Sequence, residues 1–203
     1  MKKMVKKANA FIIVNHWVLA GSFFIQMISG FGLLFHIQQV ISLFGDLSTM
    51  KSWHIHYGVV FLVSLIFTMF HYLSVSLGFS SDDIQWLSNA GGHLSKKVKL
   101  PPQDELNAGQ KIYYLTVLIT GLALCTSGLF IWLRPFSADM AGWLLLAHRI
   151  HRIGLYLLIL IIPFHIYLAT LANPGTLRIM VYGTIPLDWA KKRHAKWVQQ
   201  MGF

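Results

Sequence analysis

The strongest chemical signal in this sequence is a group of histidines in and around an apolar stretch, His148 to His165, which reads HRIHRIGLYLLILIIPFH. His151 and His165 are 14 residues apart, which on an α-helix places them on one face with about 21 Å of rise between them. An imidazole in hydrocarbon is costly, so an ionisable residue within a membrane span indicates a functional site. The alternative is two core histidines, each satisfied by a neighbouring hydroxyl or carbonyl.

The composition indicates that these histidines lie in a membrane protein. The 203 residues are 55% hydrophobic and 12% charged, with a mean hydropathy of +0.57, whereas about a quarter of a soluble domain is charged. Crossing a bilayer takes about 20 apolar residues, and four runs are long enough: 11–35, 54–78, 112–133 and 142–171. The first lacks a clear cleavage site, so we interpret it as a retained span. We predict a single domain, 1–203, that is an all-α integral membrane four-helix bundle with a tail at 172–203.

Lysine and arginine residues predict the orientation of the chain. Thirteen of the 17 flank the N-terminus, the loop between the second and third runs, and the C-terminal tail. By the positive-inside rule, both termini and that loop are cytoplasmic. The net charge of +10 then reflects topology and contact with anionic lipid rather than a nucleic-acid partner. The thirteen are Lys2, Lys3, Lys6, Lys7, Lys96, Lys97, Lys99, Lys111, Arg178, Lys191, Lys192, Arg193 and Lys196, and the other four are Lys51, Arg134, Arg149 and Arg152.

This orientation sorts the histidines into two depths. His16 lies near the cytoplasmic end of the first span, and His165 near the cytoplasmic end of the fourth. His54, His56 and His151 lie near the opposite, outer ends. A bis-histidine haem iron takes one neutral imidazole at each axial position, and helix bundles supply such ligands from facing helices. We predict two haems: an outer pair of His54 or His56 with His151, and an inner pair of His16 with His165.

Helical geometry narrows the choice of outer ligand in part. His54 and His56 are about 200° apart on a helix, so only one of them faces the bundle axis, and the spacing does not say which. His148 is about 100° off the face that carries His165. This favours His151 over His148 as the outer ligand of the fourth span.

The four remaining histidines are not predicted to be haem ligands. His71, near the inner end of the second span, is a candidate for a hydrogen bond to a haem propionate or a quinone, or else a satisfied interfacial histidine. His36, His93 and His194 fall in loops or the tail, where we expect solvated side chains.

The cysteine content limits the type of cofactor that the chain can bind. Cys125 is the only cysteine, so the chain has no internal disulfide, no iron–sulfur cluster held by four thiolates and no C-x-x-C-H haem attachment. The haems are therefore expected to be non-covalent b haems. The longest segment outside the spans, 79–111, is too short for a catalytic domain with its own core. The chain must exchange electrons with a partner.

Several motifs closely resemble the cytochrome b (gamma) subunit of respiratory formate dehydrogenase. The likeness extends over nearly the whole chain, and the N-A-G-Q-K box and the W-A-K-K-x-H tail are its most specific parts. The motifs are NAGQKIYYLTVLITGLALCTSGLFIWLRP from Asn107 to Pro135, HW at His16 and Trp17, H-x-x-x-G from His54 to Gly58, the His151 and His165 spacing followed by HIYLA, and GTLRIMVYGTIPLDWAKKRHAKW in the tail.

The resemblance implies a function for the chain. Members of that family carry two b haems in the bacterial inner membrane and take electrons from a periplasmic iron–sulfur subunit, itself joined to a molybdenum- or tungsten-containing catalytic subunit. They do not oxidise formate themselves, and pass electrons to menaquinone near the cytoplasmic haem. The family pattern places the quinone site at Asn107, Ala108, Gly109 and Gln110, and its H-x-x-x-G motif favours His54 over His56.

The chain departs from the family pattern at two places. His71 stands where the pattern suggests arginine. The glycine after His151, Gly154, follows by three residues instead of four. The first departure concerns the surroundings of the predicted inner haem or quinone. The second concerns His151, the predicted outer ligand on the fourth span.

The N-A-G-Q box has two interpretations. From the residues alone, it is favoured as a helix start with Asn107 as the N-cap. The resemblance favours a quinone site, in which the Asn107 side chain and backbone N–H groups before the first helical turn hold a carbonyl oxygen.

Two other functions stay open at this point. The same scaffold could serve another periplasmic enzyme, such as a thiosulfate reductase or a hydrogenase. A haem-free transporter or assembly protein, whose histidines bind metal or carry protons, is a third hypothesis of a different class.

Overall fold

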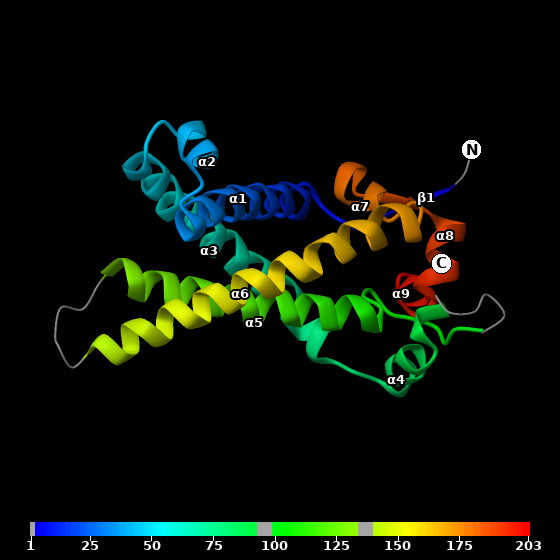
Figure 1. The fold of residues 1–203 in the computed structure, drawn as a ribbon. Helices are drawn as coiled ribbons and strands as arrows, with labels where there is room; N and C mark the ends of the chain where they lie inside the picture. Colours follow the sequence, from blue (N-terminus) through cyan, green and yellow to red (C-terminus); the bar gives the residue numbers. More distant parts are fainter. Residues whose placement is uncertain (1–2, 93–98, 134–139) are drawn as a thin grey trace. The chain divides into compact units, whose positions relative to one another are not determined.

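In a computed structural model, which describes residues 3–92, 99–133 and 140–203, the chain is mostly helical (Figure 1). Lys2, His93, Lys96, Lys97 and Arg134, which entered the predictions above, lie outside the described residues. The elements are β1 (Met4–Lys6), α1 (Ala10–Phe35), α2 (Gln38–Leu43), α3 (Leu47–Leu77), α4 (Ser81–Ser88), η1 (Ala90–Gly92), α5 (Ala108–Leu133), α6 (Ala141–Tyr167), η3 (Leu168–Ala172), α7 (Leu177–Tyr182), β2 (Thr184–Pro186), α8 (Leu187–Arg193) and α9 (Ala195–Gln200).

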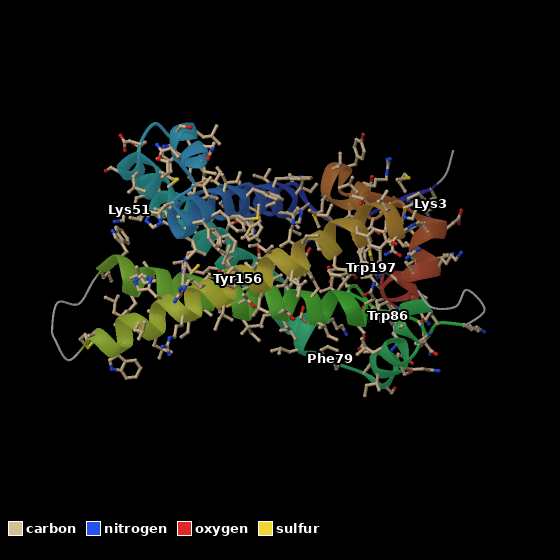
Figure 2. The ribbon with its side chains drawn as sticks, in the orientation of Figure 1. Lys3, Lys51, Phe79, Trp86, Tyr156 and Trp197 are labelled. Atoms are coloured by element: carbon tan, nitrogen blue, oxygen red, sulfur yellow. The ribbon has the colours of Figure 1, made fainter. Side chains whose placement is uncertain are left out.

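Four helices are long and apolar enough to cross a membrane: α1, α3, α5, and α6 with its π-helical continuation η3. They contain the four predicted runs almost entirely, but α3 begins at Leu47 and α5 at Ala108, earlier than the apolar runs at 54 and 112. An apolar run marks the part of a helix that suits hydrocarbon, and helical hydrogen bonding continues beyond it. Large apolar side chains such as Tyr156 of α6 project outward and are exposed, as expected for surfaces in lipid (Figure 2).

The chain divides into two compact units, which we describe separately. The bundle unit comprises Val14–Thr68 and Leu118–Phe164, and contains stretches of all four long helices. The terminal unit comprises Met1–Ile13, Met69–Val117 and His165–Phe203.

Small residues bring the helices of the bundle unit together. A Cβ atom added to Gly121 of α5 would lie 2.8 Å from the Leu65 side chain of α3, and one added to Gly154 of α6 would lie 2.8 Å from Leu124 of α5. Such contacts are typical of membrane helices, where close packing replaces the hydrophobic effect. The four long helices are therefore packed together within this unit.

A polar contact also joins α1 to α3 in the bundle unit. The Ser64 hydroxyl donates to Asn15 Oδ1 at 2.7 Å, and Asn15 Nδ2 donates to Thr68 Oγ1 at 2.9 Å. Hydrogen bonds between side chains of neighbouring helices add to packing in a bilayer. This contact stabilises the pairing of α1 with α3.

In the terminal unit, the two ends of the chain fold onto each other. Strands β1 and β2 pair antiparallel with Val5 opposite Ile185. The core beneath them is apolar and consists of Ala8, Ile179, Ile185, Ala190 and Val198. Gly183 has a φ of +70°, and a Cβ atom there would lie 2.5 Å from the Ala8 carbonyl oxygen, so only glycine suits this turn. The predicted tail 172–203 thus packs, through α7, β2, α8 and α9, against the N-terminal segment.

His194 corrects an expectation from the sequence. Its side chain was expected to be solvated, but the residue is 2% exposed and its Nδ1 lies 2.7 Å from the Asp104 carbonyl oxygen. Burial, with the neighbouring Lys7 charge, lowers the His194 pKa to about 3. The partners come from distant parts of the chain, so the sequence position alone gave no sign of them. His36, by contrast, is exposed as expected.

Lys7 ties the N-terminal segment to the same core. Its Nζ donates to the Glu105 carbonyl oxygen at 2.7 Å and lies 4.3 Å from the ring centre of Trp197, which Figure 2 labels. Burial lowers the Lys7 pKa to about 8, while the carboxylates of Glu105 and Asp104 oppose this shift. Lys7, one of the basic residues counted at the N-terminus, is therefore partly buried.

Candidate functional site

The predicted outer histidines lie close together in the bundle unit. The ring centres of His54 on α3 and His151 on α6 are 6.2 Å apart, with an interplanar angle of 63°. Two imidazoles bound at about 2 Å on opposite sides of one metal ion have ring centres on the order of 6 Å apart. The spacing therefore fits the bis-histidine ligand set predicted from the sequence, and ligation itself stays a prediction.

The competing histidines point elsewhere. His56 is exposed, and its Nδ1 lies 2.7 Å from the Ser52 carbonyl oxygen of its own helix. His148 is also exposed. Of the two pairs left open by helical geometry, the described structure brings His54 and not His56 to His151.

Each outer histidine has a serine beside its Nδ1 atom. Ser29 Oγ of α1 lies 2.8 Å from His54 Nδ1, and Ser127 Oγ of α5 lies 3.1 Å from His151 Nδ1. Both serines are buried. The four helices of the unit thus supply two imidazoles and two hydroxyls, and the serines are functional candidates that the sequence interpretation missed.

Gln26 of α1 also lies beside His54. In the amide orientation that satisfies both ends, its oxygen accepts from the Gly58 N–H at 2.7 Å, and its nitrogen lies 3.1 Å from His54 Nε2. A metal ion at His54 Nε2 would replace the contact with Gln26. Gly58, the glycine of the H-x-x-x-G motif, has its own role here, since a Cβ atom would lie 2.7 Å from Gln26.

The two inner histidines belong to different units. His16 of α1 contacts Trp17 edge to face, with ring centres 5.5 Å apart. His165 of α6 stacks on Tyr113 of α5, with ring centres 4.4 Å apart and planes within 8°. Their pairing stays a prediction from the sequence. His71 is exposed on α3 and contacts Tyr72 edge to face at 4.4 Å.

The N-A-G-Q box forms the first turn of α5. The Gln110 N–H donates to Asn107 Oδ1 at 2.9 Å, and the Asn107 N–H donates to Gln110 Oε1 at 3.0 Å. This is a reciprocal cap, so the helix-start interpretation with Asn107 as N-cap is confirmed. The cap uses the side-chain oxygen of Asn107 and not its amide NH2, so it does not conflict with a second role.

Gly109 and Ala108 fit the box against neighbouring segments of the terminal unit. A Cβ atom at Gly109 would lie 2.9 Å from the Trp86 ring of α4. The Ala108 N–H donates to Gln103 Oε1 at 3.1 Å, and Ala108 is fully buried. The box is thus enclosed by α4 on one side and the segment before α5 on the other.

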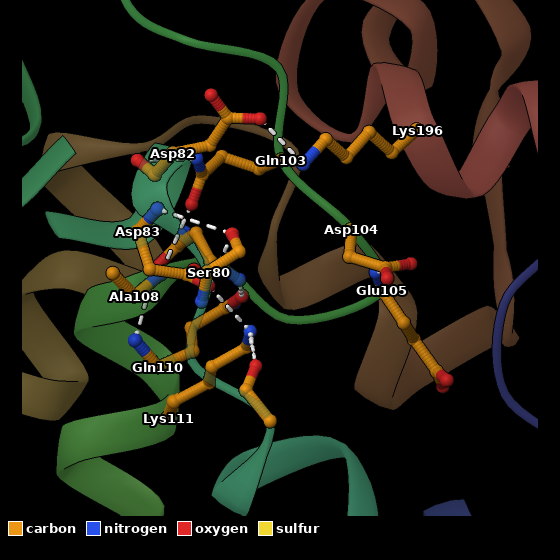
Figure 3. A network of polar contacts seen from close by, with 12 residues as sticks. Ser80, Asp82, Asp83, Gln103, Asp104, Glu105, Ala108, Gln110, Lys111 and Lys196 are labelled. Atoms are coloured by element: carbon orange, nitrogen blue, oxygen red, sulfur yellow. Dashed lines mark hydrogen bonds and ion pairs between the residues drawn. The ribbon is translucent and has the colours of Figure 1, made fainter. Parts of the chain in front are cut away.

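A buried ion pair lies directly after the box (Figure 3). Lys111 Nζ is 2.9 Å from Asp83 Oδ2 and donates to the Gly78 carbonyl oxygen at 2.7 Å, and both charged side chains are 4% exposed. Asp83 Oδ2 also accepts from the Ser80 N–H at 2.8 Å, and Ser80 Oγ accepts from the Asp83 N–H, which together form the capping box of α4. Burial alone would raise the pKa of Asp83, but hydrogen bonds from Lys111 and Ser80 hold it below its ordinary value.

Lys111 is therefore a second correction. It was counted with the basic residues of the loop between the second and third runs, but it lies inside α5 and forms an ion pair. The acceptor is 28 residues away along the chain, so the sequence did not indicate it. The Ser80 and Asp83 spacing, which matches a capping box, could have indicated α4.

Comparisons with known proteins agree over nearly the whole chain. A family model described as prokaryotic cytochrome b561 matches residues 7–183. The cytochrome b556(fdo) subunit of formate dehydrogenase from Escherichia coli (strain K12) is 31% identical over 191 residues, 93% of this chain and 89% of that protein. The nitrate-inducible cytochrome b556(Fdn) subunit of the same strain is 26% identical over 203 residues, 98% and 92% of the two chains. A formate dehydrogenase cytochrome b556 subunit from Haemophilus influenzae is 24% identical over 190 residues, 92% and 79%.

Proposed function

The chain belongs to the prokaryotic cytochrome b561 family, and on that premise we propose that it is the dihaem cytochrome b subunit of a formate dehydrogenase. Family membership makes it a membrane electron-transfer cytochrome that binds b haem, and its relatives are formate dehydrogenase cytochrome b556 subunits. The resemblance predicted from the motifs is thereby confirmed. The number of haems, the quinone and the direction of electron transfer belong to the proposal.

The observation that carries the proposal is the 6.2 Å separation of the His54 and His151 rings. The two residues would hold the outer haem through their Nε2 atoms, with both Nδ1 atoms occupied by serine contacts. A b haem held there supplies one-electron redox chemistry. His16 and His165 are proposed as the ligands of the inner haem on the sequence pattern alone, with His71 as an additional polar group nearby.

The first turn of α5 is proposed as the quinone site. Of the four box N–H groups, those of Asn107, Ala108 and Gln110 have partners within the described part of the chain. The Gly109 N–H is then the backbone donor that the box offers, since the first N–H groups of a helix have no intrahelical acceptor. Together with the Asn107 NH2 group, it would hold one carbonyl oxygen of menaquinone.

The orientation of the chain determines what the complex does. We place both termini and the quinone site on the cytoplasmic side of a bacterial inner membrane, as the basic residues indicate. The outer ends of α3 and α6 would then receive electrons from a periplasmic iron–sulfur subunit, which is fed by a catalytic subunit. The chain carries those electrons across the membrane to the quinone, which takes its protons from the cytoplasm.

A haem count on the purified chain tests the proposal. We expect two b haems in the natural chain, one in His54→Ala, and two in the matched control His56→Ala, whose side chain is exposed. A reduced-minus-oxidised spectrum measures the count. Two haems in His54→Ala, or none in the natural chain, would contradict the proposal, and the co-purifying subunits distinguish formate dehydrogenase from another periplasmic enzyme.

A further inference from the structure

We propose that two Ser–Gly steps, Ser29–Gly30 of α1 and Ser127–Gly128 of α5, are positioning elements that set the tautomer and the ring orientation of His54 and His151. The inference rests on the proposed function, because it assumes that these imidazoles bind iron. In each Ser–Gly pair, the serine hydroxyl lies beside Nδ1 of the imidazole. The glycine, which has no side chain, lies beside the Cε1 atom of the same ring. The arrangement occurs twice, on different helices and for different histidines.

At the first step, the proton of the serine is committed to its own helix. The Ser29 hydroxyl donates to the Ile25 carbonyl oxygen at 2.7 Å, with the Gln26 carbonyl oxygen at 3.3 Å as a second acceptor. A hydroxyl has a single proton, so with that proton on the carbonyl oxygen the hydroxyl acts as an acceptor toward His54 Nδ1 at 2.8 Å. The Gln26 amide nitrogen lies 3.1 Å from Nε2 and 3.2 Å from Nδ1, and in the proposed tautomer it donates to Nε2. His54 therefore carries its proton on Nδ1, and the lone pair of Nε2 is available for a metal. Ser29 is 0% exposed, so water does not compete.

The second step reaches the same tautomer through different atoms. The Ser127 hydroxyl donates to the Ala123 carbonyl oxygen at 2.6 Å, which leaves its lone pairs for His151 Nδ1 at 3.1 Å. His151 Nδ1 is also 3.0 Å from the Leu124 carbonyl oxygen, which can only accept. The Nδ1 atom of His151 must therefore carry the proton. His151 Nδ1 thus has the Leu124 carbonyl oxygen as an acceptor in addition to its serine.

Each serine is followed by a glycine, and the imidazole edge lies against that glycine. A Cβ atom at Gly128 would lie 3.1 Å from His151 Cε1, so the ring would have to shift, whereas one at Gly30 would lie 3.4 Å from His54 Cε1, at the limit of ordinary contact. The imidazole edge therefore packs against the helix backbone at these positions. Hydroxyl and glycine together define both the hydrogen bond and the plane of each ring.

This geometry predicts how the serines affect the outer haem. A hydrogen bond from the distal N–H of a ligating imidazole raises the basicity of the ligand, and such partners affect metal affinity by about 10- to 100-fold. A more basic imidazole favours the ferric state. Loss of the Ser29 acceptor should therefore raise the midpoint potential of the outer haem, whereas loss of Ser127 should raise it less, because Leu124 still accepts from His151.

The experiment compares four variants of the full chain in membranes. Ser29→Ala is paired with Ser22→Ala, which changes a buried serine of the same helix whose hydroxyl donates to the Leu19 carbonyl oxygen of that helix. Ser127→Ala is paired with Thr126→Ala, whose hydroxyl also bonds within its own helix. Redox titration gives the potential of each haem, the ferric low-spin EPR signal reports the relative orientation of the imidazole planes, and the inner haem serves as the internal standard for folding.

We expect Ser29→Ala to change the ferric-to-ferrous ratio of the outer haem by about tenfold at fixed potential, a rise of about 59 mV for a one-electron couple. Its EPR signal should also change, Ser127→Ala should give a smaller rise, and both controls should match the natural chain. A shift in Ser29→Ala no larger than in Ser22→Ala would overturn the inference. If Ser29→Ala lost both haems, the test would rest on Ser127→Ala. An unchanged potential and EPR signal of the outer haem in Ser127→Ala would then overturn the inference.

The proposed function fails by a different result. If His54→Ala and His151→Ala each kept both haems, the ligand assignment would be wrong whatever the serine variants did. Suppose instead that the histidine variants lost the outer haem, while the serine variants left its potential and EPR signal unchanged. The ligand assignment would then be supported, and the positioning role of the serines would be contradicted.

Discussion

In the bundle unit, candidate ligands are oriented by neutral groups, whereas in the terminal unit the candidate quinone box lies beside a buried pair of full charges. His54 and His151 contact hydroxyl and carbonyl oxygens. The box is followed at once by Lys111, paired with Asp83. The difference follows from the surroundings of the two regions.

A span in hydrocarbon cannot easily hold an uncompensated charge. Ser29 and Ser127 can orient an imidazole while their own protons bond to the helix carbonyls behind them, so both hydroxyls and both Nδ1 atoms have partners. At the end of a helix, the chain has to hold a loop and a short helix in place as well. One ion pair that also engages the Gly78 carbonyl and the α4 cap does this with a single lysine.

Removing one charge from the terminal unit should have the largest effect on stability. Lys111→Ala would leave the Asp83 carboxylate buried without its cation, which costs about 3–5 kcal/mol of unfolding free energy. Replacing both partners, as Lys111→Met with Asp83→Asn, should recover much of that loss because no charge stays buried. Thermal unfolding of the haem-loaded chain in detergent measures both.

Lys196→Ala is the matched control. It removes an ion pair with Asp82 whose side chains are 36% and 28% exposed, and exposed pairs contribute about 0–1 kcal/mol. If Lys111→Ala were no more destabilising than Lys196→Ala, the buried pair would not hold the box, and the contrast between the two units would lose its energetic basis.

Acid should act on the terminal unit through His194. The folded-state pKa is about 3, and the ordinary value is about 6.5. A histidine with a lowered folded pKa contributes stability that is fully present above about pH 6.5 and is lost as the pH falls toward 3, because only the unfolded state takes up the proton. At pH 5 the loss is about 2 kcal/mol. Hydrogen exchange of the β1 and β2 amides, compared between pH 7 and pH 5, measures it.

His194→Gln sharpens this test, because it removes the titrating group. The exchange rates of its β1 and β2 amides should lose most of their dependence on pH between 7 and 5, after correction for the intrinsic rate. The same pH dependence in His194→Gln as in the natural chain would show that another group controls the terminal unit.

Sequence reasoning succeeded where one physical requirement dominates. A bilayer demands about 20 apolar residues per helix, so the four spans could be predicted. The orientation of the helices, and with it the depth of each histidine, stays a prediction. The N-cap at Asn107 followed from residue type alone. It failed for Ser29 and Ser127, because a serine in a membrane helix usually bonds to its own helix, and contact with a second helix is a property of packing. It also failed for His194, whose partner Asp104 is 90 residues away.

The smallest expected effect distinguishes the two roles of Asn107. As an N-cap it accepts through Oδ1, and as a quinone ligand it would donate through its NH2 group. Asn107→Ala removes both, so it should cost about 1 kcal/mol of stability and also slow quinone reduction. Asn107→Asp keeps a capping acceptor, since aspartate is as good an N-cap as asparagine, but lacks the donor.

We therefore expect Asn107→Asp to unfold at the temperature of the natural chain while reducing menaquinone more slowly, with both haems still reducible by the partner. Stopped-flow reoxidation of the haems by a quinone analogue, beside a thermal melt, gives the two quantities on one sample. If Asn107→Asp reduced the quinone at the rate of the natural chain, and Asn107→Ala had a lowered melting temperature, Asn107 would act as an N-cap and not as a quinone ligand. The terminal unit would then contain a well-capped helix start beside an ion pair, and the quinone donor would have to be sought at the Gly109 N–H alone.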